Sequence, residues 1–184
     1  MRIIAGDARS RKLTAPEGLS VRPTSDKVKE TLFNIIAPYI YSDTSFLDLF
    51  AGSGAIGLEA LSRGAGDAVF VENGKPALKC IEENINTCRY ADRSRVMPMD
   101  VLSAIRILDG TKAFDIIFMD PPYNKGYEER VLGMLNDSGL LNPECIIICE
   151  SSKETDYGFV SDLNFEIFKV KEYKNNKHVF MRKE

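Results

Sequence analysis

The four residues Asp120-Pro121-Pro122-Tyr123 have the types and spacing that most directly suggest chemistry in this chain. Proline has no backbone N–H, so this turn offers mainly acceptors, among them the Asp120 carboxylate and the Pro121 carbonyl. Two adjacent acceptors suit an NH2 group, and hydrogen bonds to both amine protons favour a pyramidal nitrogen with an available lone pair. Tyr123 adds a ring on which a planar base can stack. The turn therefore predicts activation of an aromatic amine; the alternative is a rigid turn in which Tyr123 only packs.

A second candidate site is formed by three glycines, Gly52, Gly54 and Gly57, which separate the apolar run 46–50 from a helical pattern. Strand, glycine turn and helix in this order form the first half of a nucleotide-binding βαβ unit. Glycine lets the backbone bend tightly and lets a ligand approach without meeting a Cβ. The start of the helix should also offer unpaired N–H groups. We therefore expect a cofactor here; an ordinary glycine-rich turn is the alternative.

Acidic residues follow or end several of the apolar runs. Asp48 lies within the first run, and Glu72, Asp100 and Asp120 come at the ends of later ones. In an open α/β sheet, ligands bind outside the carboxyl ends of the strands, where carboxylates suit a site better than a core. Glu72 lies twenty residues after Gly52, a spacing at which a carboxylate can bind both hydroxyls of a ribose. For Asp100, a helix N-cap is the simpler alternative.

Apolar runs alternate with helical periodicities, which predicts an α/β fold with a mostly parallel sheet. The expected parallel strands cover residues 46–50, 68–71, 96–99, 114–119 and 145–149. The expected helices that follow the first four strands cover residues 56–61, 76–90, 101–108 and 127–135. Residues 165–170 and 179–181 surround the polar loop 173–177 and predict a C-terminal antiparallel hairpin, for seven strands in all.

The N-terminal residues are expected to form a basic extension. Residues 1–30 carry seven cations and four carboxylates, a net charge of +3 in a chain whose total is −3. Such an asymmetry suggests a polyanionic partner, with an ordinary solvated surface as the alternative. We expect residues 1–184 to form one domain, with 1–40 as the extension and 41–184 as the catalytic core.

Within the extension, residues 2–5 and 12–15 predict two short strands around a basic turn, which suits a nucleic-acid backbone. A loop over residues 16–23 follows, and Thr24 is the expected cap of the next helix. The expected apolar face of that helix consists of Val28, Leu32, Ile35 and Ile36.

Composition argues against several other classes of protein. The chain has 184 residues, of which 44% are hydrophobic and 28% charged, as in an ordinary globular domain. No apolar run resembles a signal peptide or approaches a membrane span, so we expect a cytoplasmic protein without a membrane partner. The cysteines Cys80, Cys88, Cys145 and Cys149 form no C-x-x-C pair, so no metal site is expected, and the single histidine, His178, is given no catalytic role.

Two of these motifs carry a family resemblance. DLFAGSG at 48–54 together with DPPY at 120–123 resembles the amino-methyltransferases that use S-adenosyl-L-methionine. MRIIAGDARSRKL at 1–13 and RPTSDKVKETLFNI at 22–35 are more narrowly similar to the RsmD family. The resemblance covers nearly the whole chain. It implies a Rossmann-like class I methyltransferase fold and transfer of a methyl group to N2 of the guanine at position 966 of 16S ribosomal RNA.

Roles for individual residues follow from the same resemblance. Asp48, Ala51, Gly52 and Gly54 would shape the pocket for the methionine part of the cofactor. Glu72 would bind the ribose, and Asp100 with Val101 the adenine. Asp120 and Pro121 would bind the guanine amine, and Tyr123 would stack on the flipped base. RNA phosphates would be bound by Arg2, Arg9, Arg11, Lys12, Arg22 and Lys27. The product would be S-adenosyl-L-homocysteine, and no metal is implied.

The resemblance also implies a partner, either free 16S ribosomal RNA or the small ribosomal subunit, and a monomeric enzyme. Ser10 and Lys174 stand where the family pattern favours glycine, which bears on RNA contacts rather than on methyl transfer. Three alternatives remain open at this point. They are an NAD-type oxidoreductase, which the glycines and Glu72 also fit, an adenine-N6 methyltransferase acting on RNA or DNA, and a non-catalytic RNA-binding module.

Overall fold

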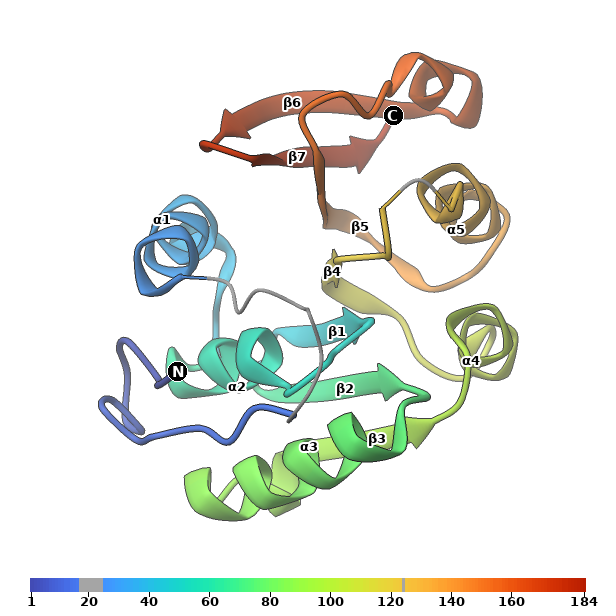
Figure 1. Ribbon diagram of the computed structural model, residues 1–184. Coiled ribbons are helices and arrows are strands. Elements are labelled where there is room, and N and C mark those ends of the chain that lie inside the picture. The colour runs from blue at the N-terminus through green and yellow to red at the C-terminus, as the bar shows by residue number, and fades with distance from the viewer. Residues whose placement is uncertain (17–24, 124) are drawn as a thin grey trace.

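The computed structural model describes residues 1–16, 25–123 and 125–184, and within them a seven-stranded sheet flanked by helices (Figure 1). The strands are β1 (Ser45–Leu49), β2 (Asp67–Glu72), β3 (Ser94–Pro98), β4 (Phe114–Met119), β5 (Leu141–Ser152), β6 (Phe165–Glu172) and β7 (Asn176–Lys183). The α-helices are α1 (Asp26–Ile36), α2 (Ala55–Ser62), α3 (Lys75–Cys88), α4 (Val101–Leu108) and α5 (Tyr127–Asn136). Three short 3-10 helices complete the described elements: η1 (Ala37–Tyr39), η2 (Ala91–Arg93) and η3 (Gly158–Leu163).

The sheet has the strand order β3-β2-β1-β4-β5-β7-β6. The pairs among β1 to β5 are parallel, and β7 runs antiparallel to both β5 and β6. The expected mostly parallel α/β sheet with a C-terminal antiparallel hairpin is therefore confirmed. The main differences are in length, because β5 and both strands of the hairpin are longer than their apolar runs.

Two apolar layers cover the two faces of the sheet. Buried side chains of α1, α2 and α3 pack on one face, and those of α4, α5 and η3 pack on the other. The ribbon shows the same division, with α1 to α3 on one side of the strands and α4 and α5 on the opposite side (Figure 1). None of the helices in the described ranges is long and apolar enough to cross a bilayer.

The connections change direction between β1 and β4, the two central neighbours. The chain moves outward in one direction from β1 through β2 to β3, then returns to β4 and moves outward in the other direction to β5. Ligands of open α/β sheets bind at such a switch point, outside the carboxyl ends of the strands. The glycine turn follows β1 and the Asp120 turn follows β4, so both candidate motifs lie at this point.

The N-terminal arm, residues 1–16 of the extension, differs from the expected pair of strands. Only one antiparallel bridge forms, between Arg2 and Lys12. Two backbone hydrogen bonds, Ile3 N–H to the Arg11 carbonyl and Leu13 N–H to the Met1 carbonyl, flank this bridge. Beyond it, the Ile4 and Ala5 N–H groups donate to the side chain of Glu59 on α2, at 2.8 and 3.1 Å. The arm is therefore fastened to the body of the protein more than to itself.

Glu59 is the centre of a buried ionic cluster, which the sequence pattern did not predict. Its fully buried carboxylate also lies 3.2 Å from the Lys29 ammonium and 2.8 Å from Nε of Arg63. Lys29 in turn donates to the Arg2 carbonyl at 2.6 Å. Burial lowers the pKa of Lys29, and the neighbouring Glu59 opposes that shift. One carboxylate thus joins the arm, α1 and α2.

This cluster explains why the apolar face of α1 differs from the expected one. The buried side chains are Lys29, Leu32, Phe33 and Ile36, whereas Val28 and Ile35 are only half-buried. The helix is rotated so that Lys29 reaches Glu59. Ser25 caps the helix by accepting from the Val28 N–H at 3.3 Å, one residue later than expected. Thr24 and most of the expected loop at 16–23 lie outside the described residues.

The outermost strand of the hairpin, β6, is mostly exposed and rich in charge. Its exposed charged side chains are Glu166, Lys169, Lys171 and Glu172. Its pairing with β7 shifts register between Ile167 and Lys169, which marks a bulge in the strand. At the opposite margin of the sheet, β3 has only five residues.

Candidate active site

The glycine turn and the Asp120 turn lie side by side because β1 and β4 pair in register, with Leu49 opposite Met119. Phe50, which directly follows β1, reaches across to Tyr127 at the start of α5, and the two rings meet edge-on with centroids 5.2 Å apart. Phe50 has a φ of +62°, an unusual value for a bulky residue. Sequence reasoning missed this contact because only the pairing of the strands brings the two rings together.

The glycine turn is open on the side where a ligand would approach. Gly52 has a φ of +57°, and no atom lies within 4 Å of the position that a Cβ would take there. Gly54 also has a positive φ and directly precedes α2. Gly57 differs, because a Cβ there would lie 2.4 Å from the ring of Phe70. The first two glycines therefore serve the turn and its open side, and the third allows α2 to pack against β2.

Asp48 lies beneath the turn, with 1% of its surface exposed. Its Oδ2 accepts a hydrogen bond from the Gly57 N–H at 2.9 Å. Burial, with a smaller effect from Glu72, raises the pKa of Asp48 to about 7, and the Gly57 hydrogen bond opposes this. The expectation that the start of α2 offers its N–H groups to a ligand is thus wrong for Gly57, because Asp48 has taken that donor.

Glu72, at the end of β2, holds the glycine turn in place. One carboxylate oxygen accepts from the Gly52 N–H at 2.9 Å, and the other accepts from the Asn73 and Gly74 N–H groups at 2.9 and 2.7 Å. Ala51 is tied to the same strand through its N–H, which donates to the Val71 carbonyl at 2.9 Å. Two carboxylate oxygens can accept about four hydrogen bonds, so Glu72 retains limited capacity for a ribose hydroxyl.

Asp100 and Val101 lie at the next carboxyl end, between β3 and α4. Asp100 is exposed and caps α4, accepting from the Ser103 N–H at 3.0 Å. Hydrogen bonds from Ser103 lower the pKa of its carboxyl. The simpler interpretation of Asp100 as an N-cap therefore describes its contacts. Val101 is buried in the layer of α4 and α5.

The Asp120 turn has the character expected of an acceptor site. Among the described residues, the Asp120 carboxylate accepts no hydrogen bond, although most of its surface is covered. Burial, followed by the charges of Glu150 and Asp48, raises the pKa of Asp120 to about 8. Pro121 is buried, and Tyr123 is 42% exposed, so a face of its ring is accessible. Burial and then Asp120 raise the pKa of Tyr123 to about 12.

Two further residues belong to this region and were not predicted for it. Glu150 on β5 and His178 on β7 are buried and lie opposite each other in the strand register. His178 was given no role because its neighbours in the sequence are those of an ordinary strand. The available signal was Glu150, an acidic residue at the end of another parallel strand.

The basic residues are spread along the arm rather than gathered at the Asp120 turn. The turn that contains Arg9 and Arg11 packs on the C-terminal ends of α2 and α3, because the Asp7 N–H donates to the Ser62 carbonyl and Arg11 donates to the Thr87 carbonyl. These helix ends lie at the opposite edge of the sheet from the glycine turn (Figure 1). Since the 14 residues of α3 span about 21 Å, the basic turn is distant from Asp120.

The other predicted RNA contacts differ in their surroundings. Arg2 is engaged with Asp26, with 2.9 Å between Nε and Oδ2. Arg9, Lys12 and Lys27 are exposed and form no ion pair with any described residue. Arg22 lies outside the described residues. Ser10, where the family pattern favours glycine, has a φ of +69°, which explains that preference.

A hollow of about 290 Å³ lies beside the basic turn. Its lining includes three arginines, Arg11, Arg89 and Arg93, together with Asp7 and Asp92. The guanidinium group of Arg93 lies over the ring of Tyr90, 4.6 Å from its centroid, so its position is fixed. Arg89 and Arg93 were missed because they belong to the α3–β3 connection, 78 or more residues after the turn.

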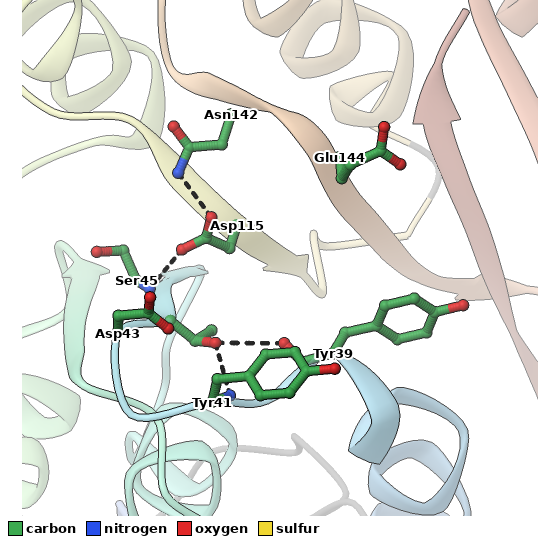
Figure 2. Close-up of a pocket in the computed structure, with 8 residues that line it drawn as sticks. Tyr39, Tyr41, Asp43, Ser45, Asp115, Asn142 and Glu144 are labelled. Atoms are coloured by element: carbon green, nitrogen blue, oxygen red, sulfur yellow. Dashed lines mark hydrogen bonds between the residues drawn. The ribbon is translucent and has the colours of Figure 1, made fainter.

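A larger hollow, of about 370 Å³, lies at the opposite edge of the sheet from the two turns (Figure 2). Its lining includes Ser45 and Asp115, near the starts of β1 and β4, and Asn142 at the start of β5. Asp115 accepts from the Ser45 N–H at 2.8 Å and from the Asn142 amide at 2.7 Å. These bonds join the strand starts, and the hollow is separate from the candidate site.

Comparison with known proteins identifies the family. Residues 1–182 match the family model described as "Conserved hypothetical protein 95". The chain is 42% identical to "Ribosomal RNA small subunit methyltransferase D" of Escherichia coli over 84% of this chain and 76% of the relative. It is 36% identical to the protein of the same name in Haemophilus influenzae over 93% and 88%. The solved structure of the Escherichia coli protein yhhF superposes with a TM-score of 0.85 at 36% identity, covering 100% of this chain and 98% of that one.

These matches confirm the resemblance found in the sequence and the class I methyltransferase fold. The chain belongs to the RsmD family, whose members in Escherichia coli and Haemophilus influenzae are named as methyltransferases of small-subunit ribosomal RNA.

Proposed function

We propose that this protein transfers a methyl group from S-adenosyl-L-methionine to the exocyclic N2 amine of the guanine at position 966 of 16S ribosomal RNA. The observation that carries the proposal is the position of the acceptor turn. Within the described part of the chain the Asp120 carboxylate has no hydrogen-bond partner, and it lies beside the open glycine turn at the switch point of the sheet. The names of the family members support ribosomal RNA of the small subunit as the substrate.

The residues at this edge fit a cationic sulfonium donor better than a dinucleotide. A bound pyrophosphate needs the N–H groups at the start of the helix, and Asp48 occupies the one at Gly57. The charges of Asp48 and Glu150 also oppose the ionisation of Asp120, so a further negative charge at this edge of the sheet would be repelled. This favours a positive ligand and disfavours phosphates. The NAD-type alternative is therefore the weaker hypothesis.

The proposed cofactor contacts are those implied by the family, adjusted to the geometry. Gly52 and Gly54 would leave room for the methionine part, with Ala51 and Asp48 fixing the turn beneath it. Glu72 would bind a ribose hydroxyl through its remaining acceptor capacity, and Asp100 with Val101 would border the adenine. The cofactor supplies an already activated methyl group, so the protein mainly has to align it with the amine.

The chain's own residues would prepare the amine. Asp120 and the Pro121 carbonyl would accept the two amine protons, which directs the nitrogen lone pair towards the glycine turn. Tyr123 would stack on the base after it leaves its own stack, as enzymes acting on bases require. The amine must lose one proton during transfer, and the Asp120 carboxylate is the nearest acceptor for it.

We also propose that residues 1–40 form an RNA-binding extension and that the surface of the protein that contacts RNA extends well beyond the Asp120 turn. Arg9, Arg11 and Lys12 lie beyond the far ends of α2 and α3, so they would contact RNA about 20 Å from the flipped base. Arg89 and Arg93 would extend that surface into the neighbouring hollow. Lys27, in the first turn of α1, would contact RNA separately.

The decisive experiment is nucleoside mass mapping of 16S ribosomal RNA that lacks the modification. Free RNA and small subunits would each be incubated with the protein and labelled S-adenosyl-L-methionine. We expect N2-methylguanine at one position with the natural protein and none with Asp120→Asn. Glu144→Gln, an exposed change at the opposite edge of the sheet, is the matched control. Label found on an adenine would overturn the guanine assignment in favour of the adenine-N6 alternative.

The RNA-binding surface has a separate test. Each cation that contacts a phosphate contributes about 0.7 to 0.9 to the slope of log affinity against log salt concentration. Changing Arg9 and Lys12 to alanine should therefore lower that slope by about 1.4 to 1.8, and adding Arg89→Ala by a further 0.7 to 0.9. Arg106→Ala on α4 is the control, because that helix covers the other face of the sheet. An unchanged slope would remove this surface from the proposal.

A further inference from the structure

Three neighbouring strands place one polar side chain each in a single row at the carboxyl edge. Met119 of β4 pairs with Cys149 of β5, so the next residues along these strands, Asp120 and Glu150, are neighbours. Glu150 in turn pairs with His178 of β7. Since side chains alternate between the faces of a sheet, Asp120, Glu150 and His178 all lie on the face that α1 and α2 cover.

The side chains two positions away on the same three strands support the assignment of the row to this face of the sheet. Phe118, Ile148 and Phe180 each lie two residues from a member of the row, and all three belong to the apolar layer of α1 to α3. Cys149 and Val179 belong to the opposite layer. The row therefore begins at the Asp120 turn, in the middle of the sheet, and runs beneath α1 and α2 towards the C-terminal hairpin.

His178 is enclosed completely. Its side chain is 0% exposed, and the rings of Phe118 and Phe180 meet it edge-on with centroids 6.1 and 6.2 Å away. Its two nitrogens each have a polar partner, Nε2 with Oε2 of Glu150 at 3.0 Å and Nδ1 with the Tyr173 hydroxyl at 3.1 Å. A histidine held at both nitrogens has a fixed ring orientation.

One arrangement of protons satisfies every member of this group. The Tyr173 hydroxyl donates to Nδ1, Nε2–H of a neutral imidazole donates to Glu150, and the Asn176 amide donates to the other carboxylate oxygen. Glu150, which is 5% exposed, then remains an ionised carboxylate with a donor on each oxygen. A buried charge needs such partners, because an unpaired one would be neutralised.

We propose that Tyr173 and His178 are positioning residues that hold the Glu150 carboxylate beside the catalytic turn, so that Glu150 sets the charge state in which Asp120 meets the base amine. The proposal rests on the proposed function, because it assigns these residues to the same methyl transfer. Glu150 contacts neither the base nor the cofactor in this scheme and acts only through Asp120.

The electrostatic surroundings of Asp120 support this assignment. Asp48 from β1 and Glu150 from β5 both oppose its ionisation, and the burial of Asp120 adds to their effect and raises its pKa to about 8. Other titratable groups near the site are Tyr123 in the same turn, Glu128 on α5, Glu72 on β2 behind Asp48, and Tyr173 with His178 behind Glu150. Glu150 and Asp48 are the groups whose charges raise the pKa of Asp120, whereas Tyr123 is itself affected by Asp120.

The sign of the expected pH effect follows from this arrangement. If the Asp120 carboxylate is the form that accepts the amine protons, the rate of methyl transfer rises with pH through the pKa of Asp120. Removing the charge of Glu150 stabilises that carboxylate and moves the rise to lower pH. Replacing His178 by phenylalanine leaves Oε2 of Glu150 without its donor, while Asn176 still donates to Oε1. We expect the buried carboxylate then to take up a proton on Oε2, with the same result.

The test compares the pH dependence of single-turnover methylation in four variants and the natural protein. We expect the midpoint to fall by about one pH unit in Glu150→Gln and in His178→Phe. His178→Gln should stay within a few tenths of the natural protein, because an amide can donate to Glu150 in place of Nε2. Glu166→Gln, an exposed change on β6, is the charge-matched control. Coincident midpoints for Glu150→Gln and the natural protein would overturn the proposal.

A second measurement separates this proposal from the proposed function. The Asp120 carboxyl can be titrated by carbon-13 NMR in the protein without RNA, with Asp120→Asn identifying the resonance. A lower midpoint in Glu150→Gln, together with absent RNA methylation in the natural protein, would refute the proposed function but leave the coupling of Glu150 to Asp120 supported. Normal methylation with an unchanged NMR midpoint would refute the role of Glu150 alone. Since Glu150→Gln keeps an acceptor for His178, the test does not depend on the folding of His178→Phe.

Discussion

Replacing Glu59 by alanine should destabilise the protein far more than replacing an exposed partner of an ion pair. Glu59 is fully buried and satisfies the Lys29 ammonium, the Arg63 guanidinium and two backbone N–H groups of the arm. Removing one partner of a buried pair costs about 3–5 kcal/mol, because it leaves the other charge buried without compensation. Glu59→Ala is therefore expected to remove a large part of the marginal stability of a domain of this size.

The loss can be converted into a melting temperature. An unfolding entropy of about 2.1 cal/mol/K per residue gives roughly 0.4 kcal/mol/K for 184 residues, so a loss of 3–5 kcal/mol lowers the Tm by about 8–13 °C. The assay is thermal unfolding at neutral pH, followed by circular dichroism. The same change should expose the arm, which limited proteolysis of residues 1–16 would detect.

The chain supplies its own control in Glu83, whose side chain is 47% exposed and lies 3.9 Å from the Lys79 ammonium on the same helix. An exposed pair of this kind contributes about 0.3–0.5 kcal/mol, so Glu83→Ala should lower the Tm by no more than about 1 °C. If Glu59→Ala melts within 2 °C of the natural protein, the view of Glu59 as the junction of the arm, α1 and α2 is wrong.

Three further predictions concern the turns. Gly57→Ala should lower the free energy of unfolding by about 1–3 kcal/mol and weaken the binding of S-adenosyl-L-methionine, because its Cβ would meet the Phe70 ring at 2.4 Å. Chemical unfolding would measure the stability and calorimetry the binding, and unchanged values of both would contradict the packing role. Ser10→Gly should raise the free energy of unfolding by about 0.5–1 kcal/mol in the same assay, because glycine adopts a positive φ without strain. A lower free energy of unfolding would argue against strain at Ser10. Tyr123→Ala should weaken RNA binding by about 1–3 kcal/mol, measured by filter binding, whereas Tyr123→Phe should retain it; equal losses would exclude stacking.

The sequence was sufficient to predict the alternation of strands and helices and the meeting of the two turns. These features depend on local patterns, such as the apolar run 114–119, which coincides with β4. They also depend on the rule that parallel strands present their carboxyl ends at one edge. The position of Asp120 beside the glycine turn follows from these two facts without any side-chain detail.

The remaining features depend on contacts between residues far apart in the chain. Lys29 was not among the residues of the expected apolar face, but Glu59, thirty residues later, draws it into the core. The arm pairs with itself at a single bridge, and two of its N–H groups instead donate to the same carboxylate. His178 gave no signal because its partner Glu150 lies 28 residues earlier and faces it only through strand register. Helical and strand periodicity report burial, and none of these pairings can be read from it.

The margins of the sheet have a consequence for how this protein behaves at high concentration. An exposed strand edge is a template on which another chain can add a strand, and long flat apolar edges lead to aggregation. Here one margin is a strand of only five residues, and the other carries two exposed lysines and two exposed glutamates together with a bulge. A second copy approaching β3 would find few N–H and C=O groups to pair with. A second copy approaching β6 would have to remove water from the charged lysine and glutamate side chains. The molecule can therefore keep an open sheet at high protein concentration without growing into a larger one.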